Sequence, residues 1–289
     1  MTTVEEGGSR ARSTARDPDR RSFGSEASWL VSDAMAVTWR NLLHTIRVKQ
    51  MITFLVLQPI VFVLLLALVF GGAIDLPGGG SYREYLMAGV FAQSVAFTTY
   101  PTALGTAFDV HLGLMDRFRT LPMHPAAIFV GRTVADLTRM MISIVVMGIC
   151  GLAVGWRISD GPMRALGGFA LLLLFGFAMS WVGAYIGMAC KTLEAVQSAG
   201  LMWLFPVTFV SSAFVPTQSM PEPLETFAEW NPVSAVAAAA RELFGNPNPF
   251  ALTDGFPAEH PVLLSVVWAV VLVVTFATLC ARKFRKAVA

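Results

Sequence analysis

The sequence predicts an all-α polytopic membrane protein with six transmembrane helices. Only 14% of its 289 residues are charged and 55% are hydrophobic, whereas soluble domains carry about 25% charged residues. Several apolar runs reach the length of about 20 residues that a helix needs to cross a hydrocarbon core of about 30 Å. The sequence lacks the short alternating segments of a membrane β-barrel. These observations together predict a helical bundle in a membrane.

The amino-terminal part of the chain divides into a polar tail and an amphipathic helix. Residues 1–26 hold five arginines and one aromatic residue, so they cannot bury enough apolar surface to fold, and we expect a disordered cytoplasmic tail. Over residues 27–50, apolar side chains recur at helical spacing while Arg40 and Arg47 share another face. Trp39 suits the headgroup region, which favours a helix lying in the membrane surface. A soluble docking helix is the alternative.

The transmembrane domain is predicted over residues 27–281, and residues 282–289 form a basic cytoplasmic tail. Pro59 lies inside the first predicted span, where it is expected to kink the helix because proline has no backbone N–H. Pro101 and Pro206 lie inside the second and fifth predicted spans. The predicted spans cover about 51–73, 84–108, 132–156, 164–189, 196–215 and 262–281.

A polar segment, residues 109–139, separates the second and third spans and is too polar to belong to either. We interpret it as a short cytoplasmic helix, a turn and the protruding base of the third span. Arg132, Asp136 and Arg139 follow one another at i, i+4 and i+7, so they share one helix face. The 17 residues after them rise about 26 Å, which places these charges at or below the cytoplasmic boundary.

Lysine and arginine predict the orientation of the chain. The amino terminus, the polar segment, the turn near residue 191 and the carboxyl terminus together hold seventeen of these residues, and the opposite side holds four. Cytoplasmic loops carry the excess of positive charge. Both termini are therefore expected in the cytoplasm, which agrees with an even number of spans.

Residues 216–261 hold eight of the sixteen prolines and are expected on the outer side. Asn231 can cap a helix with Pro232 at its first position, and Gly245 can end it. This helix is too short to span, so we expect it at, or dipping into, the outer membrane surface. The preceding PEPLETFAEW predicts a second short helix ending at Trp230. A plain extracellular cap is the alternative.

The chain carries no recognisable catalytic chemistry. It lacks GxxxxGK[ST], HExxH and GxSxG, and its cysteines and histidines are not at metal-ligand spacing, so we expect no catalytic residue, metal or bound cofactor. The spans lack acidic and basic residues near their middles, which argues against an ion-coupled carrier and a cation pore with a charged ring. An amphiphilic cargo, moved by energy delivered from outside the membrane, fits what remains.

The pattern resembles the membrane subunit of type-2 ABC exporters, and most of all the daunorubicin-resistance permeases of actinobacteria. The resemblance covers about residues 27–281. It rests on the amphipathic helix before the first span, on the six spans and on two segments, FDVHLGLMDRFRTLPMHPAAIFVGRTVAD and NPVSAVAAAAREL. The first resembles the family's polar helix, turn and Gly-Arg entry to the third span, and the second its Asn-Pro motif before the last span.

The resemblance implies roles for these segments. The amphipathic helix would be a connecting elbow, the helix between spans two and three would couple to a separate ATPase, and the short helices before the last span would shape an extracellular gate. Carried onto this chain, the coupling residues are Asp109, Met115, Asp116, Arg117, Phe118, Arg119 and Leu121. The third-span base is Arg132, Asp136 and Arg139, and the gate includes Trp230, Asn231, Pro232 and Arg241.

The resemblance also implies partners and a cargo class. Two copies of the ATPase subunit would hold ATP and Mg, and a second copy of this permease or a similar one would complete the transport path. The complex would lie in a bacterial cell membrane, contact lipid rather than nucleic acid, and export a drug, antibiotic or lipid. A glycan-polymer exporter and a non-transporting membrane scaffold or assembly protein are the alternatives, and the sequence names no individual cargo contact.

Overall fold

The protein is described by a computed structural model that covers residues 23–69, 76, 79–112, 125–249 and 255–286. Within these ranges all regular structure is helical. The elements are α1 (Phe23–Arg47), α2 (Lys49–Val69), α3 (Tyr82–Phe97), α4 (Thr99–His111), α6 (Pro125–Ala153), α7 (Pro162–Ala189), α8 (Leu193–Met202), α9 (Leu204–Phe209), η1 (Thr217–Ser219), α10 (Glu222–Trp230), α11 (Pro232–Phe244), α12 (Phe256–Glu259) and α13 (Pro261–Lys286).

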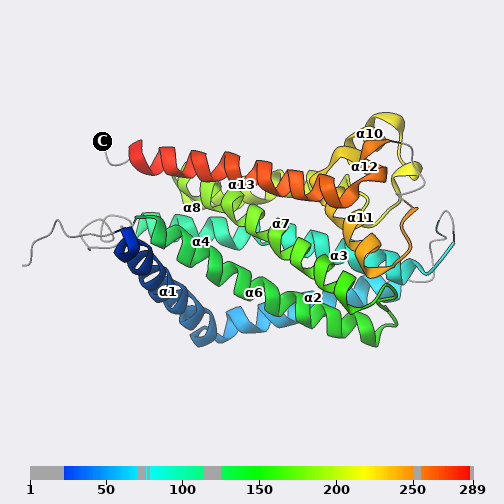
Figure 1. The fold of residues 1–289 in the computed structure, drawn as a ribbon, viewed down its shortest axis with the longest axis horizontal. Coiled ribbons are helices and arrows are strands. Elements are labelled where there is room, and N and C mark those ends of the chain that lie inside the picture. The colour runs from blue at the N-terminus through cyan, green and yellow to red at the C-terminus, as the bar shows by residue number, and fades with distance from the viewer. Residues whose placement is uncertain (1–22, 70–75, 77–78, 113–124, 250–254, 287–289) are drawn as a thin grey trace, which may run out of the picture.

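The long helices form an elongated bundle (Figure 1). The start of α1 and the end of α13 lie at one end of it, the α1 end, and α10, α11 and α12 gather at the other, the α11 end. Three helices are long and apolar enough to cross a membrane, judged by length and composition of the described residues: Val130–Ala153, Pro162–Ala189 and Pro261–Lys283. Leu55–Val69 is a shorter apolar helix. The predicted class, an all-α membrane protein, is confirmed at this level.

The amphipathic helix begins earlier than predicted. α1 starts at Phe23, inside the segment that we expected to be a disordered tail up to residue 26, and it ends at Arg47. Phe23, the one aromatic residue of the predicted tail, is the first residue of this helix. A one-residue interruption separates α1 from α2, whose internal Pro59 does not end the helix.

Two of the predicted continuous spans are broken. The second span divides at Thr98 into α3 and α4, and the fifth divides at Trp203 into α8 and α9. In both cases a proline, Pro101 or Pro206, follows three residues later. Proline removes the hydrogen bond to the carbonyl four residues earlier and its ring clashes with that carbonyl. The prediction that the fifth span continues to residue 215 is wrong, because α9 ends at Phe209.

Glycines allow α7 to pack closely against α4. A Cβ atom added to Gly183 would overlap the carbonyl oxygen of Thr99, and one added to Gly187 would overlap that of Ala103. Two small residues four apart let helix backbones approach in a membrane, where tight packing replaces the hydrophobic drive for association. The predicted second and fourth spans are therefore held together by the close approach of the α4 and α7 backbones.

An aromatic cluster fixes α11 to the bundle core. The Phe244 ring lies 6.0 Å from Phe91 and 5.3 Å from Trp156, measured between ring centroids. The indole N–H of Trp156 donates to Asn246 Oδ1 over 2.7 Å, so the buried ring has its polar atom paired. This packing positions the carboxyl end of α11.

Candidate coupling and gate sites

An ionic cluster joins three helices towards the α1 end. It consists of Arg40 on α1, Asp109 on α4, and Arg132, Asp136 and Arg139 on α6. The three α6 residues share one face, as their spacing predicts. The structure brings this face against α1 and α4, so the charges of Arg132 and Asp136 lie between helices.

Asp109 ties the end of α4 to α6. Its carboxylate pairs directly with the guanidinium of Arg132, and Arg40 Nη2 approaches the same oxygen at 4.0 Å. Gly105, one turn before Asp109, makes the space, because a Cβ atom there would overlap a guanidinium nitrogen of Arg132. Asp109 and Arg132 are largely shielded, and a buried carboxylate keeps its charge only when such partners surround it.

Asp136 forms the second half of the cluster. Its residue is 4% exposed, and its carboxylate pairs with the guanidinium of Arg139. Thr102 Oγ1 on α4 donates to Asp136 Oδ2 over 2.8 Å, and Arg139 Nη1 donates to Thr45 Oγ1 on α1 over 3.0 Å. Hydrogen bonds on both sides of the Asp136–Arg139 ion pair thus link α6 to α4 and to α1.

Direct packing reinforces this connection between α1 and α6. A Cβ atom on Gly131 would come within 2.6 Å of the Ala34 carbonyl oxygen and 2.7 Å of Val37 Cβ. The Thr38 hydroxyl donates to the Gly131 carbonyl over 3.0 Å. Because the two helices touch through backbone and are bonded through side chains, a displacement of α6 would carry α1 with it.

The rest of the predicted coupling segment lies outside the described residues. This applies to Met115, Asp116, Arg117, Phe118, Arg119 and Leu121. Of the predicted coupling residues only Asp109 is described, and it is already engaged with the third-span base. The sequence pointed to the charged residues, but it did not pair Asp109 with Arg132, and it missed Thr45, Thr102 and Gly105.

At the α11 end, Asn231 performs two tasks. Its Oδ1 accepts from the backbone N–H of Val233 over 2.8 Å and caps α11, as predicted, with Pro232 at the first helical position. Its Nδ2 donates to the carbonyl oxygens of Val207 and Val210 over 2.7 and 2.8 Å. Asn231 therefore holds the end of α9 while it starts α11.

Arg241 holds the same segment from the other end of α11. This arginine has 0% exposure. Its Nε donates to the Tyr85 carbonyl over 3.0 Å, and its Nη2 donates to the carbonyls of Ser212 and Ala213 over 2.8 and 3.2 Å. The guanidinium carbon lies 3.7 Å from the centre of the Tyr85 ring. Among the described residues no carboxylate pairs with it, so carbonyl dipoles and a ring face balance the charge.

The contacts of Asn231 and Arg241, which we call the α11 clamp, explain why α9 ends early. Residues 210–213 leave the helix, and the side chains of α11 satisfy carbonyls that would otherwise lack donors. Irregular backbone inside an apolar bundle is tolerated only with such partners. The sequence predicted that Asn231 caps α11, that Pro232 begins it and that Gly245 ends it. The structure gives Gly245 a left-handed φ of 70°. The sequence analysis counted Arg241 among the charges of the outer side, whereas the structure buries it.

Trp230 is placed differently from the other predicted gate residues. It ends α10, is 49% exposed, and stacks on Phe256 at 6.5 Å between ring centroids. Its carbonyl accepts from the indole N–H of Trp268 on α13 over 3.1 Å. It therefore links α10 to α12 and α13 and takes no part in the α11 clamp.

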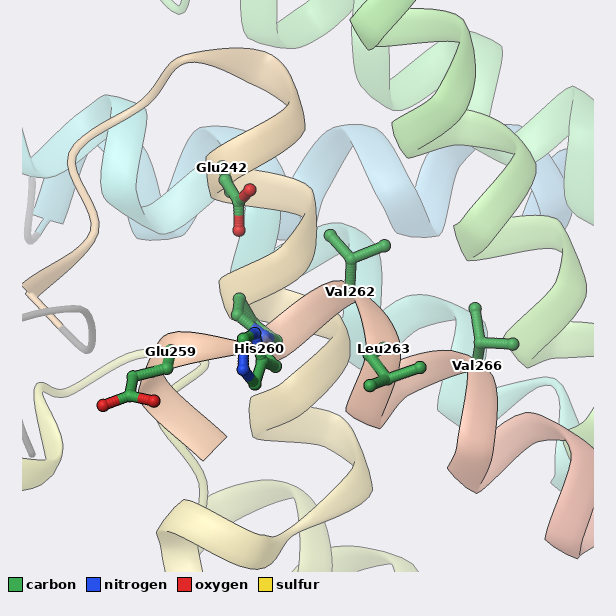
Figure 2. Close-up of a pocket in the computed structure, with 7 residues that line it drawn as sticks. Glu242, Glu259, His260, Val262, Leu263 and Val266 are labelled. Atoms are coloured by element: carbon green, nitrogen blue, oxygen red, sulfur yellow. The ribbon is translucent and has the colours of Figure 1, made fainter. Parts of the chain in front are cut away.

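A surface pocket of about 410 Å³ lies between α11, α12 and α13 (Figure 2). Its polar residues are Glu242, Glu259 and His260, and its apolar wall comes from the start of α13. The Glu259 carboxylate extends away from the other labelled side chains. The described residues contain no group of three side chains that could hold a metal ion. The polar groups of this pocket therefore do not converge on one ligand atom.

These features define a multi-pass helical membrane protein with an ionic cluster towards one end and clamped short helices at the other. The chain belongs to the ABC-2 type transporter family, whose model matches residues 33–244. It is 31% identical over 255 residues to the daunorubicin resistance ABC transporter permease protein DrrB1 of Streptomyces coeruleorubidus, covering 88% of this chain and 87% of that one.

Two mycobacterial proteins are also similar. The chain is 25% identical over 268 residues to the probable doxorubicin resistance ABC transporter permease protein DrrC of Mycobacterium tuberculosis strain CDC 1551, covering 91% of this chain and 93% of that one. It is 24% identical over 194 residues to the doxorubicin resistance permease DrrB of the same strain, covering 67% and 66%. The predicted resemblance to drug-resistance permeases is confirmed, and the chain is a transporter permease.

Proposed function

We propose that this chain is the permease subunit of an ATP-driven exporter that moves a hydrophobic or amphiphilic molecule, such as a drug, antibiotic or lipid, out of a bacterial cell. The relatives named for resistance to daunorubicin and doxorubicin support this cargo class. The chain itself has no Walker A loop, so ATP and Mg would bind to a separate ATPase, present in two copies.

The observation that carries the proposal is the ionic cluster. It lies where α4 ends and α6 begins, on both sides of residues 113–124, and it ties those helices to α1. A segment that binds an ATPase can transmit force only if the helices that it joins move as one body. The buried pair Asp109–Arg132 and the Asp136–Arg139 pair supply that rigidity. Residues 109–121 would be the coupling helix.

The other end would act as the outer gate. α11 holds the end of α9 and the irregular residues after it through Asn231 and Arg241. A shift of α11 would therefore move α9, which belongs to the fifth predicted span. In this proposal six columns cross the membrane: α2, α3–α4, α6, α7, α8–α9 and α13. Both termini would be cytoplasmic, which is supported by the start of α1 and the end of α13 lying at the same end (Figure 1).

ATP binding would close the ATPase dimer, move the coupling helix and tilt the columns, so that the gate opens in a two-state change. A second copy of this permease, or a similar one, would form the other wall of the transport path within the lipid bilayer. A glycan-polymer path would need more polar lining than these helices carry, and a scaffold would need no rigid connection between its cytoplasmic segment and its helices.

The test compares a double variant in the proposed coupling segment with a charge reversal at the start of α3. The permease is co-expressed with the ATPase of its own host and purified in mild detergent. A Phe118→Ala/Arg119→Glu variant should lose the co-purifying ATPase or most of its turnover. The control, Arg83→Glu at the start of α3, should keep both. If no nucleotide hydrolysis accompanies the wild-type chain, the exporter function is refuted and the scaffold alternative is favoured.

A further inference from the structure

The loop between α6 and α7 is hydrogen-bonded to the carboxyl end of α11 and the residues that follow it. The Ser159 N–H donates to the Phe244 carbonyl over 2.9 Å. Asn246 uses both ends of its side-chain amide: Oδ1 accepts from the Trp156 indole N–H over 2.7 Å, and Nδ2 donates to the Arg157 carbonyl over 2.8 Å. We call these three hydrogen bonds the α6–α11 link.

The link is closely packed and shielded from solvent. Asn246 is 7% exposed and Trp156 is 1% exposed. Gly245 lies directly against the loop, because a Cβ atom there would come within 2.8 Å of the Asp160 backbone nitrogen. A buried polar group that loses its partner costs about 1–3 kcal/mol. Separating the two segments is therefore costly, and they move together.

The loop is also fixed to the last turn of α6. The Trp156 backbone N–H donates to the Gly151 carbonyl over 2.9 Å, and Arg157 Nη1 donates to the Leu152 carbonyl over 2.7 Å. The Trp156 ring packs beside Gly151, where a Cβ atom would come within 3.2 Å of the ring. Because both loop residues fold back on α6, the link moves with that helix.

α6 connects the link to the ionic cluster towards the other end of the bundle (Figure 1). The helix runs from Pro125 to Ala153, and no proline interrupts it after its first residue. Asp136 of the ionic cluster lies 17 residues before Ala153, which is about 26 Å along the helix axis. A helix without a proline or another break carries a displacement along its whole length.

We infer that the α6–α11 link carries the movement of α6 to the outer gate, and that Asn246 is the positioning residue through which it acts. The inference rests on the proposed export function and deepens it, because it names the contact by which the coupling end controls the gate. The link holds the carboxyl end of α11 to α6, while Asn231 holds its amino end to α9. A tilt of α6 therefore displaces α11 and, through it, α9.

Two variants remove the link. Trp156→Phe/Asn246→Leu replaces both partners of the indole–amide hydrogen bond by apolar groups of similar shape, which costs less stability than removing one partner. Trp156→Phe alone removes one hydrogen bond of the link and decides the test if the double variant does not fold. The control is Gln218→Leu at the same end of the bundle. Its Nε2 donates to the Pro249 carbonyl over 2.7 Å, a hydrogen bond that does not involve α6 or its loop.

The readout is the distance between two spin labels, measured by pulsed electron paramagnetic resonance on the permease reconstituted with its host ATPase. The labels are attached at Glu242→Cys on α11 and Val274→Cys on α13, both at exposed positions. Each preparation is measured without nucleotide and after trapping with ATP and vanadate, and the trapped nucleotide is quantified in the same samples. Alanine replaces the native cysteines Cys150, Cys190 and Cys280.

With the link intact, trapping should change the label distance by about 2–5 Å, between a small helix shift and a one-turn step. The Gln218→Leu control should show the same change. Trp156→Phe/Asn246→Leu should still trap nucleotide, because its ionic cluster is intact, but should lose most of the change in distance. Trp156→Phe alone should show a reduced change. A role of the link in folding alone would not separate trapping from gate movement.

Three results would overturn the inference: a full change in distance without the link, no change in distance with the link intact, or loss of nucleotide trapping when the link is removed. Each of them leaves the exporter function intact as long as the wild-type chain traps nucleotide with its ATPase. If no ATPase accompanies the wild-type chain, the exporter function is refuted and the inference fails with it.

Discussion

Replacing Asn231 by serine separates the two tasks of this side chain. Serine caps a helix as well as asparagine does, so α11 still starts normally. It has no amide to reach the carbonyls of Val207 and Val210, and in the described residues these carbonyls have no other donor. A buried carbonyl left without a donor costs about 1–3 kcal/mol. Asn231→Ser should therefore destabilise the protein by about 2–6 kcal/mol.

Asn231→Ala removes the cap as well and should cost about 1 kcal/mol more than the serine variant. A matched control is Thr192→Ala at the exposed start of α8, where Oγ1 accepts only from the Ala195 N–H over 3.2 Å. That variant loses a cap and nothing else, so it should cost about 1 kcal/mol. The assay is the free energy of unfolding from titration with sodium dodecyl sulfate in mixed micelles.

The refuting result is specific. If Asn231→Ser lies within about 0.5 kcal/mol of the wild type while Asn231→Ala lies about 1 kcal/mol below it, the side chain acts as a cap alone. The carbonyls of Val207 and Val210 would then find other donors, and α11 would not hold the end of α9. The interpretation of α11 as a clamp on α9 would then fail as well.

Three further predictions concern packing, charge and pH. Gly183→Ala should cost about 1–3 kcal/mol, because α4 must move. Gly148→Ala lies inside α6 with nothing within 4 Å of the new methyl group, so it should stabilise the protein by about 0.5–1 kcal/mol; equal unfolding midpoints would contradict the close α4–α7 contact. Asp136→Asn leaves the partly buried Arg139 without its carboxylate, so it should cost about 1–3 kcal/mol and lower ATP turnover; unchanged turnover would show that the pair transmits no force. Burial, and to a smaller extent repulsion from Glu225, raises the pKa of Glu229. The folded state therefore binds this proton more tightly than the unfolded state does. The stability of the fold that comes from this proton is lost as pH rises above the ordinary pKa near 4.5. Glu229→Gln should therefore raise the melting temperature more at pH 7 than at pH 4, and a larger gain at pH 4 would contradict the raised pKa.

Local sequence chemistry predicted α11 well. Asn231 as cap, Pro232 at the first position and Gly245 at the end are all signals read within one short segment, and the helix runs from Pro232 to Phe244 as expected. Such positions are predictable because their hydrogen bonds are made to residues two to four places away. The same reasoning predicted that α10 would end at Trp230.

Long-range partners account for what the sequence did not predict. The sequence placed Pro206 inside the fifth span, but α9 ends at Phe209 because side chains some 20 to 30 residues later donate to carbonyls at its end and just after it. Arg241 looks like an external charge, since carbonyl oxygens that balance a buried guanidinium leave no mark in the sequence. The ionic face of α6 was visible in its spacing, but its partners on α1 and α4 were not.

The most direct test of the central claim is a double-mutant cycle on the Asp109–Arg132 pair. The measured quantity is ATP turnover by the permease reconstituted with its host ATPase. Asp109→Asn and Arg132→Met should each cut turnover strongly, because each leaves one shielded charge without its partner. The double variant removes both charges and should recover at least half of the lost turnover. If the single variants match the wild type, or if their effects simply add in the double variant, the ionic cluster does not couple ATP hydrolysis to the helices.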